Sequence, residues 1–242
     1  MKKFLLINWK HHWIDDIDGF VDFIKINEQQ NNELLFLLAP PHPLLGLLSK
    51  KIPTSLAAQG VTHKPLGPYT GTVGAAYLGK MGIKYVLLGH HDMRINGLTE
   101  QDIELSYIAC LQEKIQPILC CGAYDMASLE SGLKEQLRFL MNQGPQEIMI
   151  AYEPYWAIGK ESLLIDFEHL QCVYQLILSF LPDGSSFKFF YGGGLDLDKA
   201  RSLIKEPFIS GLLLGRLGLN LNILKEMSLN PSKNKIINEI RD

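Results

Sequence analysis

The sequence has few of the residues that hold metals or disulfide networks. Its four cysteines in 242 residues form neither a CxxC pair nor a His/Cys cluster at zinc-ligand spacing. Neither a metal site nor a disulfide framework is therefore expected. We expect no metal or organic cofactor, and a reducing, cytoplasmic location fits the free thiols. The cysteines are Cys110, Cys120, Cys121 and Cys172.

Long apolar runs and an excess of one charge are also missing. No stretch approaches the roughly 18 apolar residues of a membrane-spanning helix. Asn8 and Lys10 interrupt the first apolar run before it reaches the length of a signal-peptide core. The 23 basic and 26 acidic residues leave a formal net charge of −3, which is not the charge of a nucleic-acid-binding surface. We expect a small-molecule ligand, with no nucleic acid and no membrane as partners.

Eight short apolar runs recur along the chain, and they are nearly continuous in hydrophobicity instead of alternating. This pattern is typical of strands that are buried on both faces of a parallel sheet. The predicted strands are Phe4–Asn8, Leu34–Ala39, Thr54–Gln59, Tyr85–Gly89, Gln116–Cys121, Glu147–Glu153, Phe187–Gly192 and Phe208–Gly215.

Amphipathic stretches with helical spacing lie between these runs. They are clearest at Asp16–Ile26, Thr99–Lys114, Ala127–Met141 and Asp166–Phe180. Thr99 with Asp102 forms a near capping box, and Ser128 is a second candidate N-terminal signal.

No Pro/Gly/Ser-rich linker divides the chain, and the turn-dense segment Gly60–Gly74 is interpreted as a long functional loop. An open doubly wound sheet would carry a glycine fingerprint near its first strand, and none is present. The order of strands and helices predicts an α/β fold, a (β/α)8 TIM barrel that forms a single domain over residues 1–242.

Polar residues follow several of the predicted strands. The first run ends in Asn8-Trp9-Lys10, the fourth in Gly89-His90-His91-Asp92, the sixth in Tyr152-Glu153-Pro154-Tyr155-Trp156, and the last two in glycines. Taken singly, a lysine after a strand is usually a solvated charge and a histidine a satisfied surface or core group. In a parallel barrel, however, the carboxyl ends of the strands meet at one mouth, where a cation, an imidazole and a carboxylate would converge.

Four segments, taken in order, resemble the signature segments of the triosephosphate isomerase family. They are Asn8-Trp9-Lys10, Gly89-His90, residues 151–159 (AYEPYWAIG) and Tyr191-Gly192-Gly193. The Glu-Pro-x-Trp-Ala-Ile-Gly motif within the third is highly specific, and the likeness covers nearly the whole chain. The resemblance identifies the sequence as a divergent member of this family.

The resemblance implies an isomerase of glycolysis and gluconeogenesis that interconverts D-glyceraldehyde 3-phosphate and dihydroxyacetone phosphate through an enediol(ate). By matching motif positions, Glu153 would be the base and His90 the electrophile and proton shuttle. Lys10 would supply positive charge to the phosphate and the enediolate, and Asn8 a further hydrogen bond.

The resemblance also implies a lid and a phosphate site. Pro154–Lys160 matches the mobile lid of the family, and Ile158 and Leu213 would clamp the carboxylate. Backbone N–H groups after strands 7 and 8 would hold the phosphate, with Tyr191 flanking the glycines. The expected phosphate-binding residues are Gly159, Gly194, Gly215 and Arg216.

Several positions depart from the family pattern. Asp92 replaces a glutamate that pairs with the lysine, which predicts a looser Lys10 and lower activity. His91 replaces a serine that contacts the resting base, and this change predicts an altered position or pKa of Glu153. Gly194 replaces a serine and Glu161 a lid glycine, which together predict a less stable closed lid. Arg216 replaces a phosphate-loop glycine, and it would either add a phosphate contact or reshape the pocket.

A homodimer is expected, because Tyr69-Thr70-Gly71-Thr72-Val73 resembles the dimerisation loop of the family. In the family, an acid and an arginine pair between the subunits at the positions of Thr72 and Met93. Because both charged residues are replaced here, no unpaired charge is left in the interface.

Two alternatives stay open. The first is isomerisation of another short phosphosugar, such as a tetrulose phosphate, suggested by Arg216 and Gly194. The second is a weakly active or inactive paralogue that binds a phosphorylated metabolite for regulation.

Overall fold

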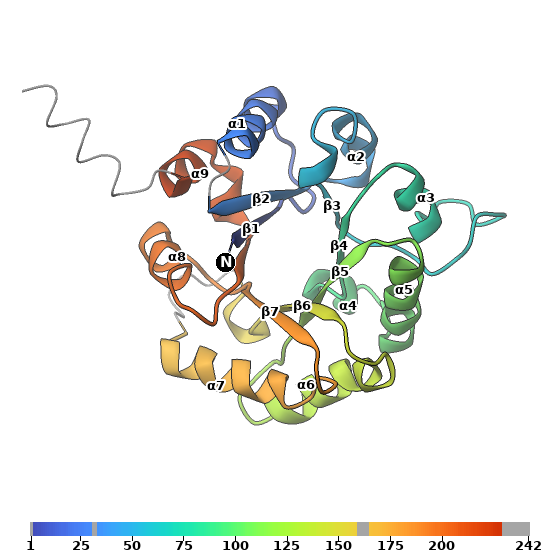
Figure 1. Ribbon diagram of the computed structural model, residues 1–242, viewed down its shortest axis with the longest axis vertical. Coiled ribbons are helices and arrows are strands. Elements are labelled where there is room, and N and C mark those ends of the chain that lie inside the picture. Colours follow the sequence, from blue (N-terminus) through green and yellow to red (C-terminus); the bar gives the residue numbers. More distant parts are fainter. Residues whose placement is uncertain (1, 31–32, 159–164, 229–242) are drawn as a thin grey trace, which may run out of the picture.

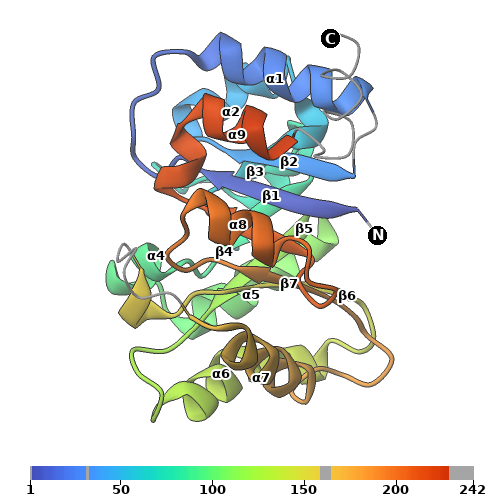
Figure 2. The same cartoon turned by 90° about the vertical axis from the view of Figure 1, so that its left-hand side faces the viewer.

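The protein forms a ring of eight parallel strands surrounded by helices (Figure 1). The structure is a computed structural model and describes residues 2–30, 33–158 and 165–228. Turned by 90°, the same view shows α1 and α2 at one end of the molecule and α6 and α7 at the other, with strands between them (Figure 2). The strands are β1 Lys3–Asn8, β2 Leu34–Ala39, β3 Ala57–Ala58, β4 Tyr85–Leu88, β5 Gln116–Cys121, β6 Glu147–Tyr152, β7 Ser186–Tyr191 and β8 Gly211–Leu214.

The sheet confirms the predicted (β/α)8 barrel as a single domain. Seven parallel ladders join the strands in the order β2-β1-β8-β7-β6-β5-β4-β3. One parallel bridge, between Leu38 and Leu56, brings the two ends of this order together. We call this junction of β2 and β3 the seam. A cavity of about 340 Å³ lies beside the seam, and Leu35, Ser55 and Tyr85 are among its lining residues.

The outer layer consists of helices, and several of them begin at a side chain that accepts a backbone hydrogen bond. Asp16 and Asp166 accept hydrogen bonds at the N-termini of α1 and α7, and Thr99 with Asp102 forms a complete capping box on α5. The helices are α1 Ile17–Gln29, α2 His42–Leu48, α3 Ala75–Lys80, α4 His91–Ile95, α5 Glu100–Gln112, α6 Leu129–Leu137, α7 Phe167–Leu178, α8 Leu197–Leu203 and α9 Leu221–Ser228. Among the described residues, no helix is long and apolar enough to cross a membrane.

The stretch predicted as a helix at Ala127–Met141 is only partly α-helical. After α6, the chain tightens into a 3-10 helix at Arg138–Asn142. Ser128 occupies the N-cap position of α6, but its hydroxyl donates to Asp125 and does not cap the helix. Ser128 therefore marks the start of α6, as the N-terminal signal predicts, without a capping hydrogen bond from its side chain.

Two predicted strands are much longer than the observed ones. The predicted strand Thr54–Gln59 overlaps a 3-10 turn at Pro53–Ser55, so only Ala57–Ala58 pairs as β3. Proline fixes its own φ and lacks an N–H, which favours such a turn over a ladder. Likewise, Phe208 lies in a turn in which Ile209 N–H donates to Glu206 O, and β8 begins only at Gly211.

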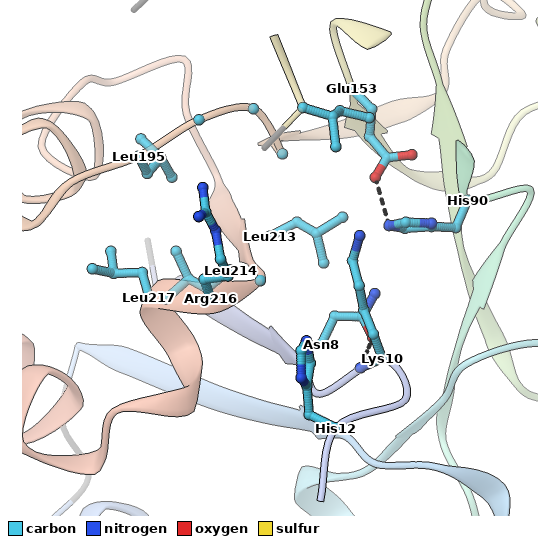
Figure 3. A pocket seen from close by; sticks show the side chains of 15 residues that line it. Asn8, Lys10, His12, His90, Glu153, Leu195, Leu213, Leu214, Arg216 and Leu217 are labelled. Atoms are coloured by element: carbon cyan, nitrogen blue, oxygen red, sulfur yellow. Dashed lines mark hydrogen bonds and ion pairs between the residues drawn. The ribbon is translucent and has the colours of Figure 1, made fainter. Parts of the chain in front are cut away.

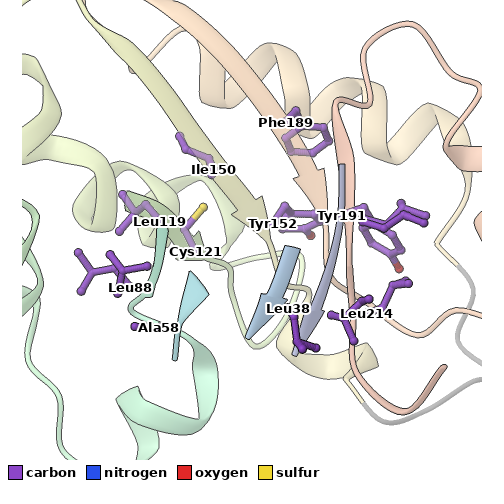
Figure 4. Close-up of a cluster of buried hydrophobic side chains, with 14 of the residues drawn as sticks. Leu38, Ala58, Leu88, Leu119, Cys121, Ile150, Tyr152, Phe189, Tyr191 and Leu214 are labelled. Carbon is purple, nitrogen blue, oxygen red and sulfur yellow. The ribbon is translucent and has the colours of Figure 1, made fainter. Parts of the chain in front are cut away.

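Both faces of the strands are buried, as the continuous apolar runs predict. Alternate residues such as Leu6, Ile118 and Phe190 fill the inside of the barrel, while their neighbours pack against the helices. Figure 4 shows part of this second layer, with side chains from β2 to β8. Cys121 belongs to it, and burial raises the pKa of its thiol to about 12. The thiol is therefore protonated and unreactive at neutral pH.

Candidate active site

A cavity of about 290 Å³ opens where the carboxyl ends of the strands meet (Figure 3). Most of the residues predicted for the site line this cavity: Asn8, Lys10, His90, Glu153, Ile158, Gly194, Leu213, Gly215 and Arg216. Asp92 and Tyr191 do not line it and contact lining residues from behind. Gly159, Lys160 and Glu161 lie outside the described residues.

Lys10 follows β1 in a backbone conformation that non-glycine residues rarely adopt, with φ of 47°. Three hydrogen bonds hold this turn. The N–H of Lys10 donates to Asn8 Oδ1 over 2.9 Å, and the side-chain amide of Gln59 donates to the carbonyls of Lys10 and Ala39 over 2.8 and 2.9 Å. An uncommon conformation that its surroundings enforce is typical of a functional position.

Asp92 forms an ion pair with Lys10, with 2.9 Å between Oδ2 and Nζ. The shorter side chain of Asp92 thus reaches the lysine. Burial alone would raise the pKa of Asp92, but the hydrogen bond with Lys10 and nearby positive charge lower it overall. Asp92 is therefore ionised at neutral pH and holds the ammonium group at the edge of the cavity.

His90 lies directly before α4 and caps it. Its Nδ1 accepts a hydrogen bond from the N–H of Asp92 over 3.1 Å. A ring nitrogen that accepts a hydrogen bond carries no proton, so the proton of the neutral ring is on Nε2. Nε2 points into the cavity, where a donor is available to an oxygen atom.

Glu153 is almost completely buried, with 1% of its surface exposed. Its Oε1 lies 3.0 Å from His90 Nε2, and its Oε2 accepts a hydrogen bond of 3.0 Å from the backbone N–H of His91 (Figure 3). Two glycines make room for it. A β-carbon at Gly122 would collide with the carbonyl of Glu153, and one at Gly192 would lie 3.3 Å from its Cγ.

The opposite side of the cavity is formed by backbone and by Arg216. Gly194 follows β7, and Gly215 lies between β8 and the 3-10 helix Arg216–Leu219. Apart from the chain neighbours of Gly215, none of the described residues has a heavy atom within 4 Å of a β-carbon position at Gly215. Space for a ligand group is therefore left beside the backbone here, and Arg216 borders the same space.

Some residues of the site escaped prediction from the sequence. Gln59 fixes the carbonyl of Lys10, although its only signal was its place at the end of the third apolar run. His12 lines the cavity four residues after β1, and Leu195, Leu214 and Leu217 add apolar wall. In the part of the chain that the structure describes, no three His, Cys, Asp or Glu side chains are placed to hold a metal ion.

Comparisons with known proteins agree with this geometry. The family model described as triosephosphate isomerase matches residues 3–229. Triosephosphate isomerase of Halorhodospira halophila is 30% identical over 236 residues, which cover 90% of this chain and 94% of the relative. That of Neurospora crassa is 32% identical over 223 residues, 83% of this chain and 86% of the relative. That of Amoebophilus asiaticus is 33% identical over 190 residues, 72% of this chain and 74% of the relative. With the barrel and the cavity in place, these matches show that the chain belongs to the triosephosphate isomerase family.

Proposed function

We propose that the protein interconverts D-glyceraldehyde 3-phosphate and dihydroxyacetone phosphate. One observation carries the proposal: Glu153, His90 and Lys10 line one cavity, each placed by the end of a different strand. An aldose–ketose isomerisation needs a base for a carbon-bound proton, a donor for the carbonyl oxygen and a positive charge for the enediolate. The cavity holds one group for each of these tasks.

The hydrogen bond between Glu153 and His90 defines the resting state. His90 Nε2–H now donates to Glu153 Oε1, although the same hydrogen is the one that would polarise a substrate carbonyl. Substrate must therefore take the place of the carboxylate beside the imidazole. Glu153 then abstracts a proton from one carbon and returns it to the next, while His90 moves protons between the two oxygens.

The phosphate would bind at the glycine-rich side of the cavity. Backbone N–H groups of Gly194 and Gly215 support this role, and the guanidinium of Arg216 adds positive charge. Ile158 and Leu213 line the cavity beside Glu153, and we propose that they clamp the carboxylate when the lid closes. The remainder of the proposed phosphate site, at Gly159, lies outside the described residues.

Substrate choice is the first test. We expect purified protein to turn over glyceraldehyde 3-phosphate with a kcat/KM at least about tenfold above that for a tetrulose phosphate, since a site that fits the smaller sugar rejects a longer one. Steady-state assays of both substrates measure this ratio. The reverse ratio would favour the tetrulose phosphate, the alternative suggested by Arg216 and Gly194, which both line the cavity. Binding without turnover of either sugar would favour a regulatory paralogue.

The variant Arg216→Gly tests which part of the substrate Arg216 contacts. If Arg216 binds the phosphate group that both sugars carry, Arg216→Gly should raise the KM for both substrates by a similar factor. If Arg216 instead selects the longer sugar, only the kcat/KM of the tetrulose phosphate should fall.

We further propose that the protein is a homodimer. Between β3 and α3, the chain at 60–74 extends outward beyond α3 (Figure 1), and Tyr69 within this segment is exposed. Other large apolar side chains are also exposed: 83% of the surface of Trp13, 57% of that of Tyr77 and 60% of that of Ile95. Met93 packs against Gly60, and Thr72 donates to the carbonyl of Tyr69. Large exposed apolar side chains of this kind support a protein–protein contact.

The dimer predicts a mass in solution of twice the 27.3 kDa of one chain. Size-exclusion chromatography with light scattering measures it. Tyr69→Asp should shift the equilibrium towards monomer, because it places a charge in the apolar contact. A mass of one chain at all concentrations would contradict the proposal.

A cytoplasmic place in glycolysis and gluconeogenesis follows from the proposed reaction. The four thiols support it, because Cys110, Cys120, Cys121 and Cys172 are all free and free thiols are usual in a reducing compartment.

A further inference from the structure

An aromatic cluster lies beside Glu153, and the chemistry proposed above does not use it. The rings of His91 and Tyr155 are stacked, with centroids 4.3 Å apart and planes at 26°. Tyr124 meets both rings edge-on, at 5.6 Å from His91 and 5.1 Å from Tyr155. Stacked and edge-to-face pairs at these distances attract each other beyond simple burial. The cluster therefore joins three separate segments: α4, the loop after β5 and the chain after β6.

The same segments hold the backbone on either side of Glu153. The N–H of Glu153 donates to Cys121 O over 2.8 Å, and the N–H of Tyr155 donates to Ala123 O over 3.0 Å. The N–H of His91 holds the carboxylate itself. These hydrogen bonds tie the main chain at Glu153 and Tyr155 to the loop after β5. The His91 ring, directly and through Tyr124, connects the carboxylate's partner to the chain beyond Glu153.

The stacked pair of His91 and Tyr155 contributes packing, and two of its polar atoms are left without a hydrogen bond. His91 Nδ1 and the hydroxyl of Tyr155 are buried and have no hydrogen-bond partner among the described residues. Burial lowers the pKa of His91, against the opposing effect of Glu153 and Asp92, while His90 and Lys10 lower it further. The imidazole is therefore neutral at neutral pH. Because unpaired buried polar atoms cost free energy, the contribution of this ring lies in its flat shape.

We propose that His91 is a positioning residue for Glu153, and that it acts by stacking on Tyr155. The stack keeps α4 and the segment after β6 in one relative position, so that the His91 N–H and the Glu153 carboxylate stay aligned. Loss of the ring removes the contact between α4 and this segment while the backbone hydrogen bonds of Glu153 and Tyr155 remain. The His91 N–H and the carboxylate are then less precisely aligned. This inference rests on the proposed function, in which Glu153 takes the proton.

Two substitutions at one position separate the ring from its nitrogens. His91→Ala removes the stack, and His91→Phe keeps a flat ring without a titrating group; the backbone N–H stays in both. We expect His91→Ala to lower kcat about tenfold, since small misplacements of a reacting group cost this much or more, with KM changed by less than about twofold. His91→Phe should restore kcat to within about threefold of wild type. Steady-state kinetics with glyceraldehyde 3-phosphate measure both, and thermal melting checks that the variants fold.

The inference is overturned if His91→Ala is as active as wild type, or if His91→Phe is impaired as strongly as His91→Ala. A wild type without isomerase activity would instead refute the proposed function. A second measurement then decides the positioning role: the carboxyl signal of Glu153 in protein labelled with ¹³C-glutamate, assigned with Glu153→Gln. This signal should shift in His91→Ala and return in His91→Phe, and an unchanged signal in His91→Ala overturns the inference.

Discussion

Glu153→Gln should lower kcat/KM for glyceraldehyde 3-phosphate by about 1,000-fold, within the range for loss of a general base. The amide has almost the shape of the carboxylate but cannot accept a proton from carbon. Its oxygen can replace only one of the two acceptors of the resting state, because His90 Nε2 and the His91 N–H both donate to the carboxylate. One donor will therefore face an NH2 group. Steady-state turnover of protein from a host without its own isomerase measures the effect.

Glu153→Asp is the matched control. It keeps the carboxylate but withdraws it by one methylene, so its activity should lie between those of wild type and Glu153→Gln. Equal activity of Glu153→Gln and wild type would assign the proton transfer to another group. Equal losses in both variants would mean that the position of the carboxylate matters as much as its basicity.

Lys10→Met should lower kcat/KM by about 100- to 1,000-fold, as expected when a fixed charge is removed from a developing anion. Methionine keeps the length of the side chain, and the ammonium group is lost. We expect KM to rise and kcat to fall together, because Lys10 borders the cavity that both phosphate and enediolate would occupy. Kinetics in both reaction directions measure this change.

Asp92 provides the control for Lys10. Lys10→Met leaves the Asp92 carboxylate without its ion-pair partner, and this negative charge alone could repel the substrate. Asp92→Asn combined with Lys10→Met removes that charge. If the double variant recovered most of the activity, the single loss would reflect repulsion by Asp92, and the proposed role of Lys10 would be wrong.

The barrel could be predicted because burial on both faces leaves a direct mark on the sequence. Strands such as Leu34–Ala39 and Gln116–Cys121 have the predicted bounds, since every residue faces either the barrel interior or a helix. The prediction failed where a local turn competes with the ladder. Thr54 and Ser55 belong to the predicted strand, yet Pro53 before them favours a 3-10 turn over Pro53–Ser55.

The site was predictable where a polar residue directly follows a strand. Lys10, His90 and Glu153 were found in this way, because topology alone brings the carboxyl ends of parallel strands together. Two contacts made by the chain around these three side chains were not predicted. Gln59 acts on a residue 49 positions earlier, and His91 stacks on a ring 64 positions later. Such pairs depend on side-chain direction across the barrel mouth, which spacing in the sequence does not determine.

The two ends of the barrel differ at the seam between β2 and β3. Lys10, His90 and Glu153 follow β1, β4 and β6, which belong to one uninterrupted series of paired strands that runs the long way round from β2 to β3. At the end where the candidate site lies, the amide of Gln59 also spans the seam, from the residue after β3 to the carbonyls of Ala39 and Lys10. The strand ends that carry Lys10 and its neighbours are thus joined across the seam. At the other end, a cavity lies beside Ser55, and Glu28 accepts hydrogen bonds from Thr54 and Ser55 there.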